Sequence, residues 1–361
     1  MRSQVERCEC SRDTVSLKRD EEHVRLLLRV SSMPLISTLQ NMAHQANAEI
    51  NYLVQRSKYN LYEEMQSEFP RLLSQPSVGD SIEELFQKLR NQLFVSTDLS
   101  PLRIEKEIQK AIQSFFMQLL APTFICATTT TTESVTQSYA NCLRNNAPSW
   151  KIFYGSEQNE LIAKLQRAIL NYRIIEKTID KLHRSVVEME TMNTSCIAGF
   201  TAAVYCDLDC SDLKRTSLPI RYCNDACINA VYNCLGDSVQ HWNSFVTILR
   251  KLSVDFDYGF SQLEKEIINS VSYAFQIQAP SIARVVLKKC IALLSNQSTS
   301  APLTVTDHYF SHPPAIEMKL ISTIRKFTSY IGWWEKFAAN LCADASRSSV
   351  CWNGTILISR L

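Results

Sequence analysis

Residues 196–234 read CIAGFTAAVYCDLDCSDLKRTSLPIRYCNDACINAVYNC and contain six of the chain's 13 cysteines. Cys206 and Cys210 are four residues apart, and so are Cys223 and Cys227. On a helix, this spacing places both side chains of a pair on one face. Two chemistries suit such pairs. They are a tetrahedral zinc site made of four cysteines and two parallel disulfides that run from each pair to another segment.

The other seven cysteines decide between these two chemistries. They are Cys8, Cys10, Cys126, Cys142, Cys290, Cys342 and Cys351. A zinc site would leave nine cysteines without a role, and C-x3-C is looser than the usual zinc knuckle. We therefore favour disulfides, which place the protein in an oxidising compartment. The alternative is an intracellular helical scaffold with a structural four-cysteine zinc site.

The composition is that of a globular protein without a recognisable catalytic motif. Of 361 residues, 45% are hydrophobic and 20% charged, and the net charge of +2 provides no global field for nucleic acid or an anionic membrane. Seven glycines leave little for phosphate-binding loops, and no G-x-G-x-x-G, G-x-S-x-G or H-E-x-x-H occurs. We expect no catalytic residue, no cofactor and no metal ligand, and therefore no enzyme.

Apolar residues recur at spacings of three and four along most of the chain, which predicts helices. One predicted helix contains the stripe from Leu39 to Leu53. Another begins at Ser100-Pro101 and ends at Pro122, before a loop at 128–132. The longest is expected over 156–192. Further helices are expected near 82–93, 220–236, 238–252, 258–277, 280–295 and 315–342. No alternating pattern supports a strand, so the sequence predicts an all-α, elongated fold with an exposed loop at 295–314.

The glycosylation and targeting signals fit a secreted domain that is part of a longer protein. Three N-x-[ST] sequons, at Asn193, Asn296 and Asn353, fall in predicted loops and are expected to carry N-linked glycans. Residues 1–20 contain no apolar signal segment, and Leu361 follows no hydrophobic tail. We expect the chain to be incomplete at both ends.

Several short runs occur in an order that is typical of a known family. They are Ser138–Cys142, Tyr205-Cys206 with Cys210, Tyr222–Cys234 followed by Trp242-Asn243-Ser244-Phe245, Trp334-Glu335-Lys336-Phe337 with Cys342, and Cys351-Trp352-Asn353-Gly354. Together these runs resemble the core domain of glypicans. The resemblance covers most of the chain from Cys8 onward.

The resemblance implies one elongated, disulfide-linked domain over residues 1–361. It implies a heparan sulfate proteoglycan core that modulates secreted growth factors and morphogens such as Wnt, Hedgehog and BMP-type ligands. Heparan sulfate and a GPI lipid anchor to the plasma membrane would be attached outside this chain. Three features depart from the family. Cys8-Glu9-Cys10 replaces an adjacent cysteine pair, and the chain has neither an R-x-x-R processing site nor a Ser-Gly dipeptide.

The resemblance also implies a disulfide pairing. Carried over by position, it joins Cys142 to Cys290, Cys196 to Cys234, Cys223 to Cys351 and Cys227 to Cys342. Cys8 and Cys10 would pair with Cys206 and Cys210 in an order that stays open. Cys126 is then the unpaired thiol.

Overall fold

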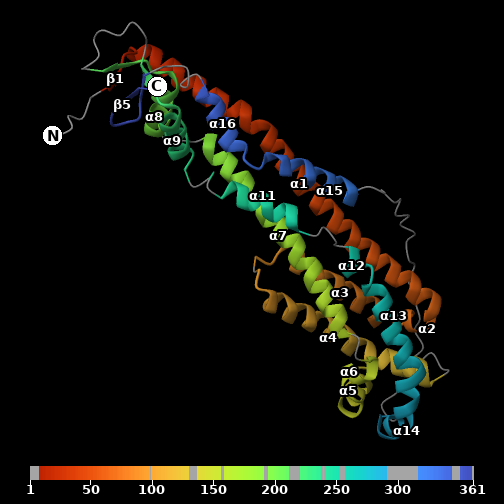
Figure 1. Cartoon of the computed structure of the whole chain (residues 1–361). Helices are drawn as coiled ribbons and strands as arrows, with labels where there is room; N and C mark the ends of the chain where they lie inside the picture. The colour runs from red at the N-terminus through yellow and green to blue at the C-terminus, as the bar shows by residue number, and fades with distance from the viewer. Residues whose placement is uncertain are drawn as a thin grey trace, which may run out of the picture. The chain divides into compact units, whose positions relative to one another are not determined.

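The computed structural model describes residues 8–97, 99–129, 136–155, 158–190, 194–210, 220–236, 239, 241–252, 257–290, 316–343 and 350–359 (Figure 1). The helices of its N-terminal half are α1 (Thr14–Glu68), α2 (Pro70–Leu73), α3 (Pro76–Phe94), α4 (Pro101–Thr128), α5 (Gln137–Asn146), α6 (Trp150–Tyr154) and α7 (Gln158–Glu190). Those that follow are α8 (Thr194–Tyr205), α9 (Asn224–Leu235), α11 (Trp242–Lys251), α12 (Asp257–Phe260), α13 (Leu263–Tyr273), the π-helix η1 (Ala274–Gln278), α14 (Ala279–Cys290), α15 (Ile316–Phe327), the 3-10 turn η3 (Thr328–Tyr330) and α16 (Trp333–Leu341). The predicted all-α class is confirmed. The predicted 295–314 loop and the end of the predicted 280–295 helix lie outside the described residues.

The chain divides into two compact units, neither of which is continuous in sequence. Unit 1 comprises 1–44, 177–252 and 318–361, and unit 2 comprises 45–176 and 253–317. Helices α1 and α7 each contribute residues to both units. Every disulfide described below joins two cysteines of the same unit.

The longest described helix is α1, with 55 residues, whereas α7 has 33, so the prediction that 156–192 is the longest element is wrong. The stripe predicted from Leu39 extends backward through Leu35, Leu28 and Val24, which are all buried. Pro34 lies inside the helix, on its exposed side. A proline in a helix interior costs about 3 kcal/mol, and burial of this long apolar stripe offsets that penalty.

A second proline also fails to end a helix. Pro122 lies inside α4, which continues to Thr128, so the predicted end at Pro122 is wrong. Residues 119–126 are buried on every side of the helix, and this tertiary burial outweighs the local helix-breaking preference. The predicted start is confirmed, because Ser100 is the N-cap residue and Pro101 opens the helix. By length and composition alone α4 is apolar enough to cross a bilayer, but 67% of its most apolar window is buried inside the protein.

Five short strands lie among the described residues of unit 1, where the sequence predicted none. Strands β1 (Cys8–Cys10) and β2 (Leu208–Cys210) pair antiparallel. Strand β4 (Val350–Trp352) lies between β3 (Arg221–Tyr222), which is parallel to it, and β5 (Leu357–Ser359), which is antiparallel. Strands of two or three residues are too short to produce a readable alternation of apolar and polar residues.

Candidate functional site

Six disulfides organise the two units. The structure brings together the four pairs that the glypican resemblance implies. Their Cα–Cα distances are 5.8 Å for Cys142–Cys290, 5.2 Å for Cys196–Cys234, 4.8 Å for Cys223–Cys351 and 5.9 Å for Cys227–Cys342. All four lie within the range that a disulfide can bridge, which ends at about 7 Å. These links close long stretches of sequence, and the shortest of them already separates its cysteines by 38 residues.

The open order of the N-terminal cysteines is resolved by strand direction. Cys8 lies directly opposite Cys210 in the antiparallel β1–β2 pair, and the two are bonded. Cys10 is bonded to Cys206, which lies two residues before the start of β2. The spacing of Cys206 and Cys210 suggested that they share a helix face. They do not, because α8 ends at Tyr205.

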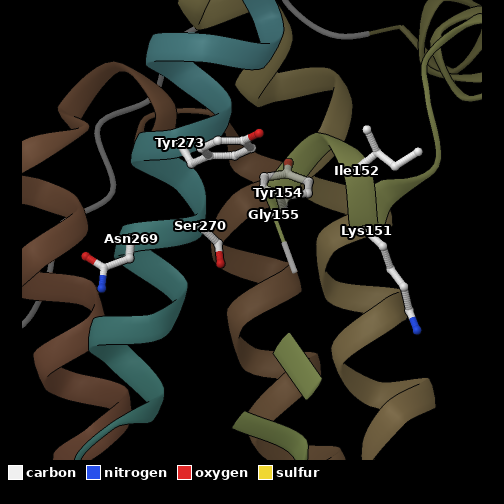
Figure 2. A pocket seen from close by; sticks show the side chains of 7 residues that line it. All are labelled: Lys151, Ile152, Tyr154, Gly155, Asn269, Ser270 and Tyr273. Atoms are coloured by element: carbon white, nitrogen blue, oxygen red, sulfur yellow. The ribbon is translucent and has the colours of Figure 1, made fainter. Parts of the chain in front are cut away.

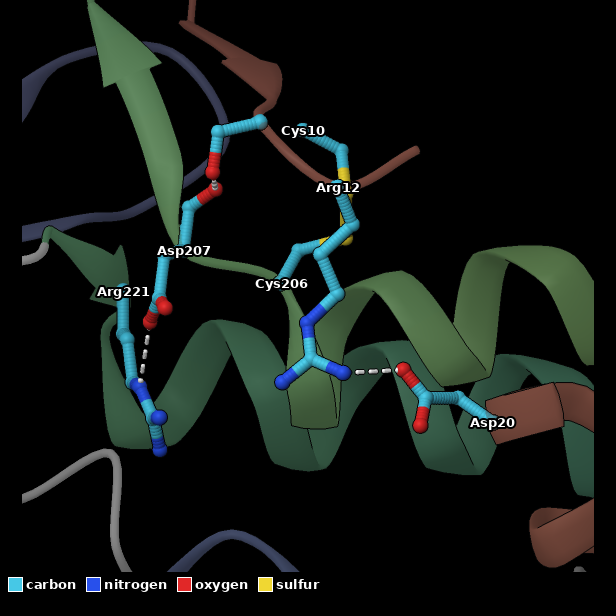
Figure 3. A network of polar contacts seen from close by, with 7 residues as sticks. Cys10, Arg12, Asp20, Cys206, Asp207 and Arg221 are labelled. Carbon is cyan, nitrogen blue, oxygen red and sulfur yellow. Dashed lines mark hydrogen bonds and ion pairs between the residues drawn. A yellow bond between two sulfur atoms is a disulfide. The ribbon is translucent and has the colours of Figure 1, made fainter. Parts of the chain in front are cut away.

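Polar contacts hold the N-terminal segment beside β2 (Figure 3). Ser11 donates from both its backbone nitrogen and its Oγ to the carbonyl oxygen of Asp207, at 2.9 and 2.8 Å. The Asp207 Oδ1 atom accepts a hydrogen bond from Arg221 Nε at 3.0 Å, and Arg12 forms an ion pair with Asp20. Backbone pairing, side-chain contacts and disulfides thus all hold the N-terminal segment in place through the same few residues.

The second cysteine pair holds the C-terminal segments. Cys223 is the N-cap residue of α9 and Cys227 lies one turn later, with Cys227 N donating to Cys223 O at 2.9 Å. One helical turn therefore binds Cys351 of β4 and Cys342 at the end of α16. Because Cys206, Cys210, Cys223 and Cys227 are each bonded to a different cysteine, their thiolates are not available for a four-cysteine zinc site.

Cys126 is the free cysteine of the described chain, and it is buried in α4. Its sulfur lies 3.6 Å from the carbonyl oxygen of Arg71. Burial raises the pKa of the Cys126 thiol to about 11. Since the thiolate is the reactive form, this cysteine is suited to packing and not to chemistry.

Two of the aromatic runs singled out in the sequence meet in unit 1. Trp242 Nε1 donates to the carbonyl oxygen of Tyr330 at 2.9 Å. The neighbouring Asn243 donates to Glu335 Oε1 at 2.6 Å and accepts from the backbone nitrogen of Gly332 at 2.8 Å. These contacts hold the turn between η3 and α16 against α11, so the polar residues of both runs have a structural role.

A cavity of about 490 Å³ opens in unit 2 between α6 and α13 (Figure 2). Tyr154 and Tyr273 supply aromatic rings to it, and Ser270 is buried beside them. The full lining is Lys151, Ile152, Tyr154, Gly155, Asn269, Ser270 and Tyr273. Sizes of about 300–1,000 Å³ and a mixture of aromatic and polar groups are typical of ligand sites.

Two unusual backbone conformations lie at the cavity. Gly155 ends α6 with φ +92° and ψ −178°, a conformation that essentially only glycine adopts. Tyr273 is followed by the π-helix η1, and Gln278 of that helix donates to the Tyr273 hydroxyl at 2.8 Å. Tyr154 donates to Thr123 Oγ1 at 3.0 Å, and complete burial raises the pKa of its hydroxyl. Segments of π-helix often occur at functional sites.

Sequence reasoning missed this cavity. No motif marks it, because its residues come from two segments more than a hundred positions apart. The available signal was Gly155, one of only seven glycines, which falls between two predicted helices.

Of the three predicted glycosylation sites, the structure describes Asn353, while Asn193 and Asn296 lie outside the described residues. Asn353 is exposed between β4 and β5. Its Oδ1 accepts hydrogen bonds from the backbone nitrogen and the hydroxyl of Thr355, both at 2.9 Å, and from Ile356 N at 2.8 Å. The two essential residues of the sequon are therefore in contact, and the Asn353 Nδ2 forms no hydrogen bond with the residues described.

A family model described as Glypican matches residues 8–360. Among solved structures, C-terminally truncated glypican-1 is similar with a TM-score of 0.66 and 17% identity, covering 96% of this chain and 76% of that one. The Drosophila Dally-like protein core domain has a TM-score of 0.59 and 16% identity, covering 96% and 88%. A structure of Dally-like protein in complex with O-palmitoleoyl serine has a TM-score of 0.56 and 15% identity, covering 96% and 76%. No curated protein sequence matches the chain.

Proposed function

This chain belongs to the glypican family of non-enzymatic heparan sulfate proteoglycan cores, and from that premise we propose that it modulates secreted growth factors and morphogens. The ligands that we propose are of the Wnt, Hedgehog and BMP type. The observation that carries this proposal is the match over residues 8–360, together with a disulfide frame that agrees with the pairing expected for the family.

The same premise supports a location outside the cell. Disulfides persist in oxidising compartments, and 12 of the 13 cysteines of this chain form disulfides. We propose that heparan sulfate and a GPI lipid anchor are attached beyond the residues of this chain and hold it at the plasma membrane. N-linked glycans at Asn193, Asn296 and Asn353 belong to the same proposal. We propose no nucleic-acid partner, no cofactor and no catalytic role.

We further propose that the cavity between α6 and α13 receives an acylated serine of a secreted ligand. Dally-like protein in complex with O-palmitoleoyl serine motivates this choice of ligand. The aromatic rings of Tyr154 and Tyr273 offer apolar contact to an acyl chain, while Ser270 and Asn269 offer hydrogen bonds to an ester. Because the apolar contact supplies most of the affinity, binding should depend only weakly on salt.

The test measures the affinity of the bare protein for a serine peptide with and without an O-palmitoleoyl group, from low to high salt. We expect binding of the acylated peptide only. Asn269→Trp places a large ring at the exposed edge of the cavity and should weaken binding at least tenfold. Gln87→Trp, at an exposed position of α3, is the matched control and should leave the affinity unchanged.

Two results would count against the acyl site. Equal binding of the unacylated peptide would show that the acyl chain is not recognised. A steep loss of affinity with salt would assign recognition to surface charge instead. The broader proposal is tested separately by measuring binding of the whole chain to candidate growth factors, which does not depend on this cavity.

A further inference from the structure

Positive charge is concentrated in one part of unit 2, although the whole chain is nearly neutral. The segments 136–155 and 274–290 contain no Asp or Glu at all, whereas about one residue in ten of the whole chain is acidic. Their basic residues are Arg144, Lys151, Arg284, Lys288 and Lys289. A net charge of +2 therefore conceals a region whose charge is entirely positive.

These segments form α5, α6, η1 and α14, in which α14 contacts both α5 and η1, and η1 contacts α6. Figure 1 labels α5, α6 and α14 in this part of unit 2. The Cys142–Cys290 disulfide links α5 to α14, and Lys289 Nζ donates to Asn146 Oδ1 of α5 at 3.2 Å. Arg284 and Lys288 are both exposed and lie one turn apart on α14, so they share a face of that helix. The disulfide therefore holds together the two helices that carry these cations.

Within the part of the chain that the structure describes, neighbouring groups do not neutralise this surface. Residues 111–128 of α4, which packs against α5, α6 and α14, carry no charged side chain. None of the five basic residues forms an ion pair with any residue that the structure describes. Other lysines of the same unit do form such pairs, as Lys88 does with Glu84 and Lys110 with Glu107. Exposed cations without nearby carboxylates produce a local positive potential despite a neutral whole.

We propose that the surface of α5 and α14, formed by Arg144, Arg284, Lys288 and Lys289, binds a sulfated polysaccharide chain of the glycosaminoglycan class. Closely spaced cations suit a linear polyanion, because several sulfates bind at once and release their counterions. The disulfides place the protein in an oxidising compartment, where sulfated polysaccharides occur and nucleic acids do not serve as partners. This site does not depend on the proposed acyl cavity or on glycan attachment to this protein.

The test uses the whole chain, produced without attached glycosaminoglycan, and a heparin oligosaccharide of defined length. We expect binding that weakens as salt rises and that is lost with the fully desulfated oligosaccharide. The triple variant Arg284→Gln, Lys288→Gln and Lys289→Gln should lose at least tenfold in affinity. The matched control Lys88→Gln, Lys106→Gln and Lys110→Gln removes the same charge from α3 and α4 and should change the affinity less than twofold.

Lys289 also donates a hydrogen bond to Asn146 that joins two helices, so its substitution could act through the structure. A second variant that keeps Lys289 separates this effect from the loss of charge. Arg144→Gln, Arg284→Gln and Lys288→Gln leave that bond in place and should show the same loss. Equal binding by the variants and the wild type would overturn the proposal. So would an equal loss in the control, because it would indicate a response to net charge alone. Comparable affinity for polyglutamate of equal charge would also overturn it, by showing that sulfated sugar is not preferred.

Discussion

Ser57 of α1 and Glu264 of α13 are 207 residues apart in sequence, and Ser57 Oγ lies 2.9 Å from Glu264 Oε2. The same hydroxyl oxygen lies 2.9 Å from the carbonyl oxygen of Phe260. A serine has one proton to donate, so Ser57 either shares it between the two oxygens in a three-centre hydrogen bond or accepts a hydrogen bond from a protonated Glu264. Burial is the main cause of a raised pKa of Glu264 and outweighs the hydrogen bonds from Ser57 and Asn60, which lower it, so the protonated form is favoured relative to an exposed glutamate.

This geometry predicts a specific pH dependence of stability. The pKa of Glu264 is higher in the folded state than in the unfolded chain. The stabilisation that this group contributes is therefore fully present at pH values below its pKa in the unfolded chain. This stabilisation is lost as the pH rises through the raised pKa of Glu264 in the folded protein. Glu264→Gln should remove this loss and make the protein more stable than the wild type at neutral pH. Denaturant unfolding from mildly acidic to neutral pH measures both curves.

The control for that experiment is Glu105→Gln, which changes an exposed carboxylate of α4. Its stability curve should follow that of the wild type. If Glu264→Gln is instead less stable than the wild type at neutral pH, the buried group is ionised and held by its hydrogen bonds to Ser57 and Asn60.

Cys126 should be the single thiol of the chain and should be inert in the folded protein. With its pKa raised to about 11, almost no thiolate exists at neutral pH, and the side chain is buried. Alkylation with iodoacetamide, without a reductant, should modify no cysteine in the native protein and one cysteine per chain in denaturant. The Cys126→Ala variant should show none in either condition. Two or more reactive thiols in denaturant would mean that at least one of the six disulfides is not formed.

Three glycines should respond to alanine in three different ways. Gly155→Ala should cost about 1–3 kcal/mol of stability, because φ +92° with extended ψ strains any residue with a Cβ. Gly259→Ala should be destabilising for a different reason. Its Cβ would lie 2.7 Å from Ala168 Cβ and 2.9 Å from the carbonyl oxygen of Lys164, which forces α12 away from α7.

Gly199→Ala is the matched control for these two variants. Gly199 lies in α8, and among the described residues no heavy atom apart from its chain neighbours and its own helix backbone lies within 4 Å of the new Cβ. Alanine should therefore stabilise the protein by about 0.5–1 kcal/mol. Thermal unfolding of the three variants separates the effects. A destabilised Gly199→Ala variant, or an unchanged Gly155→Ala variant, would contradict the local geometry described here.

Asn353 should carry an N-linked glycan when the chain passes through a secretory pathway. It is exposed, and the Thr355 hydroxyl already contacts its side-chain oxygen at 2.9 Å. Mass spectrometry should find the glycan on the peptide that contains Asn353, and enzymatic deglycosylation should remove it. Thr355→Ala should abolish the modification, whereas the neighbouring exposed change Ile356→Val should retain it. Unmodified Asn353 in the wild type would exclude the site.

The two units should unfold together as a single domain. Helices α1 and α7 pass without interruption from the residues of one unit into those of the other, so neither unit can unfold without disturbing two helices of its neighbour. Calorimetry should show one transition with equal calorimetric and van't Hoff enthalpies. Two resolved transitions would establish two independent domains.

The sequence by itself determined the helical class, the approximate extent of most helices and, through the glypican resemblance, four disulfide pairs. The stripe from Leu39 to Leu53 and the start of α4 at Ser100-Pro101 were predictable because periodicity and capping are local properties of the chain. Cys223 and Cys227 were also predictable as a unit, since one helical turn places them together.

Only the tertiary structure decided the features that depend on distant residues. Antiparallel pairing of β1 with β2 places Cys8 opposite Cys210 and leaves Cys10 for Cys206, whereas a parallel pairing would reverse that order. Pro122 remains helical because residues 119–126 of α4 are buried on all sides, and the cavity is lined by Gly155 and Tyr273, which lie far apart in sequence. Each of these outcomes depends on strand direction or packing between segments far apart in sequence. Local helix preferences, which amount to less than about 1 kcal/mol per residue for most residue types and to about 3 kcal/mol for proline, are outweighed there by burial.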